Sequence, residues 1–81
     1  MKDLTLAQIA AVIRLNWKNV YFGAVPYLDA MSTMNHISEN YGCDTGSSVV
    51  AYLLSNMTSF RGECAREVKK ELNSRLKASY K

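Results

Sequence analysis

The sequence predicts an all-α fold, a compact bundle of four helices with the last helix the longest, in one domain that spans residues 1–81. Apolar residues recur at three- and four-residue steps along most of the chain, which is the period of an amphipathic helix. The sequence contains no alternating strand pattern, internal repeat or low-complexity run. A chain of 81 residues, 48% of them hydrophobic, is expected to bury a modest core without a large internal substrate cavity, which does not favour an enzyme.

The first helix is expected to begin after Thr5, which is spaced from Gln8 for a capping box. Gly23 is expected to end this helix as a left-handed cap. The apolar stripe between them consists of Leu6, Ile9, Ala10, Ile13, Trp17 and Val20. Val12 and Leu15 lie off the stripe, which indicates either a second packed neighbour or an exposed surface for a partner.

Pro26 is expected to be the first residue of the second helix, because its fixed φ suits that position and its missing N–H would have no partner there. We expect the helix to continue to Gly42. The residues predicted to share its inner face are Tyr27, Ala30, Met31, Met34, Ile37 and Tyr41.

Asp44 or a following hydroxyl residue is expected to cap a shorter third helix, with Tyr52 off its inner face. That inner face is predicted to contain Val49, Val50, Leu53, Leu54 and Met57. Thr58 and Ser59 are expected to cap the long final helix. The core stripe predicted for this last helix is Phe60, Cys64, Val68, Leu72 and Leu76.

Charge is distributed unevenly along the chain. Residues 1–18 have a net charge of +2, residues 19–60 contain no Lys or Arg and have a net charge of −3, and residues 61–81 have a net charge of +4. Such asymmetry affects the choice of partner and the solubility rather than the fold.

The expected start of the final helix is a candidate anion site. Ser59, Arg61 and Gly62 stand there, where free amides and the helix dipole attract negative charge. The basic residues that follow are Arg66, Lys69, Lys70 and Lys77. Together they predict a binding module for nucleic acid or an anionic ligand.

An ordinary solvated helix is the alternative interpretation of the same residues. Arg61 would then form an ion pair within the molecule, with Asp29, Glu39 or Asp44 as its partner. The outer face would carry ion pairs at helical spacing, namely Glu63 with Arg66, Glu67 with Lys70, and Glu71 with Arg75.

Four aromatic residues crowd the region between the first two helices: Trp17, Tyr21, Phe22 and Tyr27. Aromatic side chains are enriched at the energetic centres of protein interfaces, so these residues, with Val12 and Leu15, are predicted to bind a partner. In the alternative interpretation, Trp17 and Tyr27 belong to the core, and Tyr21 and Phe22 cover the end of the bundle.

The sequence predicts no catalytic residue, cofactor or metal. Ser32 and His36 stand on one polar helix face, which cannot supply an oxyanion hole or exclude water. Cys43 and Cys64 lack the paired spacing of a zinc site and are expected to be reduced thiols. No signal peptide or apolar run of about 18 residues is found, so we expect no membrane interaction and a location in the cytoplasm.

Several segments resemble small uncharacterised proteins of tailed bacteriophages and prophages. They are Asn16–Tyr27, Asn40–Gly42 with Ser47 and Val49, and Ser59–Glu63. The resemblance covers most of the chain, carries no site residues, and implies an accessory protein that acts inside the infected bacterium. Small proteins of this class include inhibitors of host enzymes, anti-CRISPR proteins among them.

Two functions are therefore expected from the sequence. In the first, the protein binds a bacterial host protein, such as a CRISPR nuclease, and inhibits or redirects it without catalysis. This hypothesis includes a protein that also associates with itself. In the second, the final helix binds nucleic acid or an anionic ligand. Salt dependence distinguishes them, because phosphate contacts weaken steeply with ionic strength.

Overall fold

Four α-helices dominate the computed structural model, which describes residues 1–42 and 44–79. They are α1 (Leu6–Asn16), α2 (Val25–Met31), α3 (Gly46–Ser55) and α4 (Glu63–Ser79), and a short 3₁₀ helix, η1 (Phe22–Ala24), precedes α2. A two-stranded sheet, β1 (Asn40–Tyr41) and β2 (Asp44–Thr45), lies between α2 and α3. The predicted mostly helical fold, with α4 the longest helix, is confirmed.

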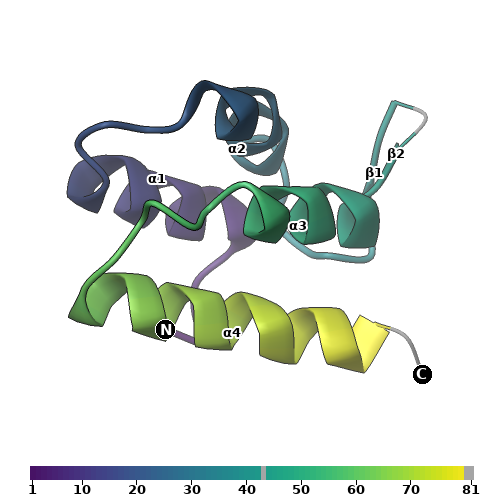
Figure 1. Cartoon of the computed structure of the whole chain (residues 1–81). Helices are drawn as coiled ribbons and strands as arrows, with labels where there is room; N and C mark the ends of the chain where they lie inside the picture. Colours follow the sequence, from purple (N-terminus) through teal and green to yellow (C-terminus); the bar gives the residue numbers. More distant parts are fainter. Residues whose placement is uncertain (43, 80–81) are drawn as a thin grey trace.

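The core lies where α1 and α3 meet the other two helices. Both α1 and α3 pack against α2 and against α4, so α2 and α4 lie on opposite sides of the molecule (Figure 1). The largest fully buried side chains come from all parts of the described chain: Leu6, Ile9, Ile13, Leu28, Met31, Met34, Val49, Val50, Leu53, Met57, Phe60 and Leu72. No polar or charged residue is buried among the residues that the structure describes.

The start of α1 is as predicted, but its end is not. Thr5 and Gln8 form the capping box, with the Gln8 amide donating to the Thr5 hydroxyl at 3.1 Å and the Thr5 amide donating to Gln8 Oε1 at 2.8 Å. The helix ends at Asn16, because Trp17 leaves the helical conformation to stack on Phe60. The prediction that Gly23 caps this helix is therefore wrong, and Gly23 lies in η1 instead.

The second helix begins at Val25, with Pro26 in its first turn, and ends at Met31 rather than near Gly42. The Ser32 and Thr33 hydroxyls donate to the backbone carbonyls of Asp29 and Ala30 at 2.7 Å, an alternative to continued helical bonding. The Glu39 carboxylate then accepts from the amides of the turn that follows. Tyr41, predicted to face inward, is 46% exposed on β1.

A small hairpin replaces the end of the predicted second helix. Its strands are antiparallel, with Asn40 opposite Thr45 and Tyr41 opposite Asp44, and Gly42 adopts a φ of 60° in the turn. Strands of two exposed residues leave no alternating pattern in a sequence. Thr45, one of the hydroxyl residues after Asp44, then caps α3 by accepting from the Ser48 amide at 3.1 Å.

The final helix begins three residues after the predicted Phe60, at Glu63. Phe60 is buried, as predicted, but it precedes the helix, and Gly62 makes the turn with a φ of 109°. The Lys69 ammonium donates to the Phe60 carbonyl at 2.7 Å, which holds this turn against the helix. The residues that α4 buries are Ala65, Val68 and Leu72, while Cys64 and Leu76 are half-buried.

Replacing Thr5 by alanine tests the capping box. We expect Thr5→Ala to lower the free energy of unfolding by about 1 kcal/mol, because the Gln8 amide loses its acceptor. Urea denaturation followed by circular dichroism measures the change. Thr58→Ala, an exposed threonine outside any helix N-cap position, is the control, and an equal loss in both variants would contradict the assignment.

Candidate functional site

Four aromatic side chains gather on the side of the molecule formed by η1, α2 and α3. Phe22 is 79% exposed, Tyr52 is 51% exposed and Tyr21 is 45% exposed, whereas Tyr27 is half-buried. The ring centroids of Tyr21 and Phe22 lie 4.8 Å apart, and those of Tyr27 and Tyr52 lie 5.5 Å apart. We call these four side chains the aromatic surface.

The end of α3 links the two aromatic pairs. A Cβ atom added to Gly23 would lie 2.6 Å from the Tyr21 ring and 2.9 Å from Asn56 Oδ1, so both groups crowd over this glycine. Asn56 in turn donates to the carbonyl of Tyr52, one turn earlier, at 2.8 Å. Tyr27 packs on Tyr52, so both aromatic pairs lie beside the C-terminal half of α3.

The structure separates the residues that the sequence grouped as partner-binding. Trp17 is only 5% exposed and stacks on Phe60 with centroids 5.3 Å apart, so its assignment to the contact surface is wrong and the core alternative is correct. Val12 is half-buried and packs against the core. Leu15 is 82% exposed at the end of α1, outside the aromatic surface.

Tyr52 is the member of this surface that the sequence analysis did not assign to a site. Its position off the inner stripe of the third helix was the available signal. A single exposed tyrosine on a helix does not by itself indicate a binding site. The tertiary structure packs Tyr52 against Tyr27, which is 25 positions earlier in the chain.

The candidate anion residues occupy the turn before α4 and the outer face of that helix. Ser59, Arg61 and Gly62 lie before the helix begins, so they do not form its first turn. Arg61 is exposed and donates from Nε to the Thr58 carbonyl at 3.5 Å. The Lys69 side chain is engaged by the Phe60 carbonyl, whereas Arg66, Lys70 and Lys77 are exposed.

The expected ion pair of Arg61 is not formed with the residues proposed for it. Asp29 pairs with Arg14 of α1, and Glu39 accepts hydrogen bonds from backbone amides. Within the described ranges, the other ion pair joins Glu71 to Arg75 at 2.7 Å, as predicted from their spacing.

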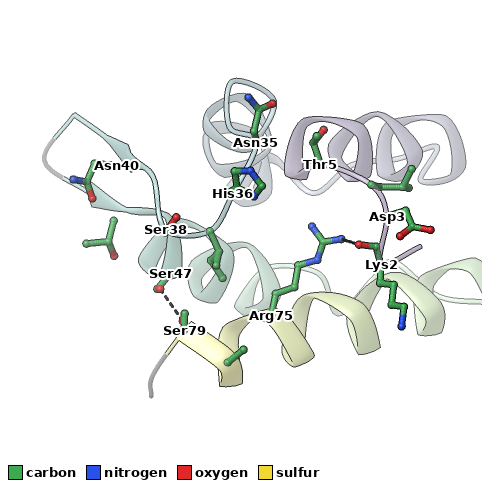
Figure 2. Close-up of a pocket in the computed structure, with 14 residues that line it drawn as sticks. Lys2, Asp3, Thr5, Asn35, His36, Ser38, Asn40, Ser47, Arg75 and Ser79 are labelled. Carbon is green, nitrogen blue, oxygen red and sulfur yellow. Dashed lines mark hydrogen bonds between the residues drawn. The ribbon is translucent and has the colours of Figure 1, made fainter.

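An open cleft of about 680 Å³ lies between the N-terminal segment, residues 35–40 and the C-terminal half of α4 (Figure 2). His36 and Arg75 line opposite walls. Arg75 donates to the carbonyls of Met1 and Lys2, both at 3.2 Å, and the hydroxyls of Ser47 and Ser79 join at 2.9 Å. These hydrogen bonds connect the N-terminal segment and α3 to α4.

Ser32 and His36 lie after the last residue of α2, so the polar helix face predicted to carry both of them is not formed. The Ser32 hydroxyl donates to a backbone carbonyl, and the Asp29 carboxylate is paired with Arg14. Residues 1–42 and 44–79 contain no group of three His, Cys, Asp or Glu side chains placed to hold a metal ion. Cys64 is a half-buried free thiol, and Cys43 lies outside the described residues.

Comparisons with known proteins found no match to a family model, a curated protein or a solved structure. The resemblance to phage accessory proteins therefore stays a prediction. None of the helices in the described part of the chain is long and apolar enough to cross a membrane.

Proposed function

We propose that this protein binds a partner protein through the aromatic surface and performs no catalysis of its own. The observation that carries the proposal is the exposure of Phe22 within a cluster of four aromatic side chains. A largely exposed aromatic ring contributes little to the core, whereas burying aromatic side chains supplies much of the binding energy of protein interfaces.

The aromatic surface is held by secondary structure rather than by a free loop. Phe22 belongs to η1, Tyr27 to α2 and Tyr52 to α3, while Tyr21 directly precedes η1, and each ring packs against another ring of the surface. Side chains that are already ordered lose little conformational entropy on binding. This arrangement supports a role as preorganised anchors.

The elements of the aromatic surface all lie within residues 19–60, which contain no Lys or Arg. The carboxylate of Asp29 in this segment is paired with Arg14, and that of Glu39 accepts hydrogen bonds from backbone amides. We therefore propose a contact with the partner that is mainly apolar. With the resemblance noted above, we propose that this partner is a bacterial host protein, with a defence nuclease as one example, and that the chain inhibits or redirects it in the cytoplasm.

The first test is an affinity capture from nuclease-treated bacterial lysate at low and moderate salt, followed by titration of the purified partner. We expect one stoichiometric protein at both salt concentrations, because an apolar interface responds weakly to ionic strength. Light scattering of the isolated protein shows whether a second copy of the chain is that partner. Failure to recover any stoichiometric partner, with a monomer in solution, would contradict the proposal.

Serine substitutions at exposed aromatic residues locate the binding surface. We expect Tyr52→Ser and Phe22→Ser each to weaken partner binding by about thirtyfold, which corresponds to the loss of a central anchor. Tyr41→Ser is the control, because Tyr41 is exposed to nearly the same degree as Tyr52 but lies on the hairpin. Isothermal titration calorimetry measures the affinities, and equal effects of Tyr41→Ser and Tyr52→Ser would rule out the aromatic surface.

A further inference from the structure

A second surface, on the α4 side of the molecule, carries exposed basic side chains. Two adjoining hollows lie where α1 ends and α4 begins, with volumes of about 390 and 350 Å³, and both are lined by Phe60 and Arg61. Lys18 lines the first hollow and Arg66 lines the second. No carboxylate lines either hollow.

The basic surface continues along the outer face of α4. Arg66, Lys70, Asn73 and Lys77 are spaced four, three and four residues apart, so they share one face of the helix. The described residues that line a third hollow include Lys70 and Lys77 and, again, no carboxylate. We call the five exposed basic residues the cationic track: Lys18, Arg61, Arg66, Lys70 and Lys77.

The ion pairs that would neutralise this track are not formed. Glu63 does not pair with Arg66, and Glu67 does not pair with Lys70, although both pairs have helical spacing. Glu67 and Glu71 line a hollow beside Met1 and Lys2, and Lys70 of the track lines the same hollow, so these carboxylates flank the track at that position. Of the three pairs at helical spacing, the described residues form one, between Glu71 and Arg75, and neither residue belongs to the track.

We infer that the cationic track binds the phosphodiester backbone of a nucleic acid without reading its sequence. From Arg66 to Lys77 the helix rises about 16 Å. A duplex of that length carries about nine negative charges, so the track meets a dense array of phosphates. Guanidinium groups donate paired hydrogen bonds to phosphate oxygens. Neutral hydrogen-bonding side chains lie beside the basic ones: Asn16, Asn19, Ser59 and Asn73.

Hydrogen-bonding groups along the track favour a nucleic acid over a membrane surface. Binding to a bilayer requires apolar side chains that enter the lipid, and a helix that lies on a membrane buries a wide apolar face. The outer face of α4 presents Arg66, Lys70, Asn73 and Lys77 instead, and Leu76 beside them is half-buried.

This inference does not rest on the proposed function. The aromatic surface lies on η1, α2 and α3. Apart from Lys18, which follows α1, the track lies on α4 and the turn before it, and α4 is on the far side of the core from α2 (Figure 1). Variants of one surface therefore leave the other intact, and either proposal can fail alone.

Fluorescence anisotropy with labelled 20-base-pair DNA, and with RNA duplexes of the same sequence, tests the inference. Four or five phosphate contacts predict a slope of about −4 for the logarithm of the association constant against the logarithm of salt concentration. Affinity then falls by roughly 250-fold between 50 and 200 mM salt. Two unrelated sequences should bind with equal affinity, and a tenfold difference between them would exclude pure backbone recognition.

Two arginine variants form the matched pair. We expect Arg66→Gln to weaken binding by about eightfold at 100 mM salt and to reduce the salt slope by about one. Arg14→Gln changes the net charge equally, but Arg14 lies on α1 and pairs with Asp29, so binding should be unchanged. The fluorescence of Trp17 and circular dichroism verify that both variants are folded.

Three results would overturn the inference. The first is an absence of binding to either nucleic acid at 50 mM salt. The second is equal weakening by Arg14→Gln and Arg66→Gln, which would mean that only net charge matters. The third is binding to vesicles with anionic phospholipid headgroups but not to nucleic acid, which would identify the track as a membrane contact.

Discussion

Gly46→Ala is expected to destabilise the protein by at least about 3 kcal/mol, a large part of the roughly 4–12 kcal/mol expected for a domain of this size. A Cβ atom at this position would lie 2.2 Å from the Ile37 carbonyl oxygen and 2.9 Å from the Glu39 carbonyl oxygen. Both contacts are with backbone atoms, which cannot move aside as a flexible side chain does. The Gly46 amide also donates to the Glu39 carbonyl at 2.7 Å, so relieving the clash sacrifices this hydrogen bond.

Gly42→Ala is the control for this prediction. Gly42 has a φ of 60° but open space around its Cα, so alanine costs only the local backbone strain, about 1–2 kcal/mol. Guanidinium denaturation of both variants measures the difference. The dependence of the free energy of unfolding on denaturant concentration should match that of the parent protein. If Gly46→Ala were no more destabilising than Gly42→Ala, the result would contradict the close packing of residues 37–39 against the start of α3.

Phe60→Ala is expected to cost about 3–5 kcal/mol, because it removes a fully buried ring at the junction of α1 and α4. Trp17 stacks on this ring, so the substitution also leaves a cavity beside the sole tryptophan of the chain. The fluorescence of Trp17 reports the change directly, through a red-shifted emission and an earlier unfolding transition.

Phe22→Ala provides the matched comparison, since it makes the same chemical change at a ring that is 79% exposed. We expect it to change the free energy of unfolding by no more than about 0.5 kcal/mol. Similar losses of stability in the two variants would contradict the assignment of Phe60 to the core and of Phe22 to the surface.

Helix starts marked by a nearby capping residue were more predictable than helix ends. The start of α4 is an exception, because the helix begins at Glu63 and the prediction that Thr58 and Ser59 cap it is wrong. The capping box at Thr5 and the cap at the start of α3 depend on residues a few positions apart, which the sequence displays directly. The end of α1 depends on the stacking of Trp17 on Phe60, which is 43 positions away. The end of α2 depends on competing bonds from Ser32, Thr33 and Glu39. Such competition has no periodic signature.

The candidate sites, too, were predicted from the sequence only in part. The sequence identified Tyr21, Phe22 and Tyr27 as an unusual cluster, but only packing showed that Trp17 belongs to the core and that Tyr52 joins the surface. It also identified the basic residues of the final helix. Spacing predicted three Glu pairs there, and among the described residues the structure forms the one between Glu71 and Arg75.

Composition and periodicity alone determined that this chain is mostly helical, because a helix presents its apolar side every three to four residues whatever surrounds it. The same patterns located the caps and the uneven charge. The tertiary structure decided where two helices stop, which aromatic rings are exposed and which basic side chains stay unpaired. These outcomes depend on contacts between residues distant in sequence, such as those of Trp17 with Phe60 and Tyr27 with Tyr52, and the free energy of such contacts exceeds local preference.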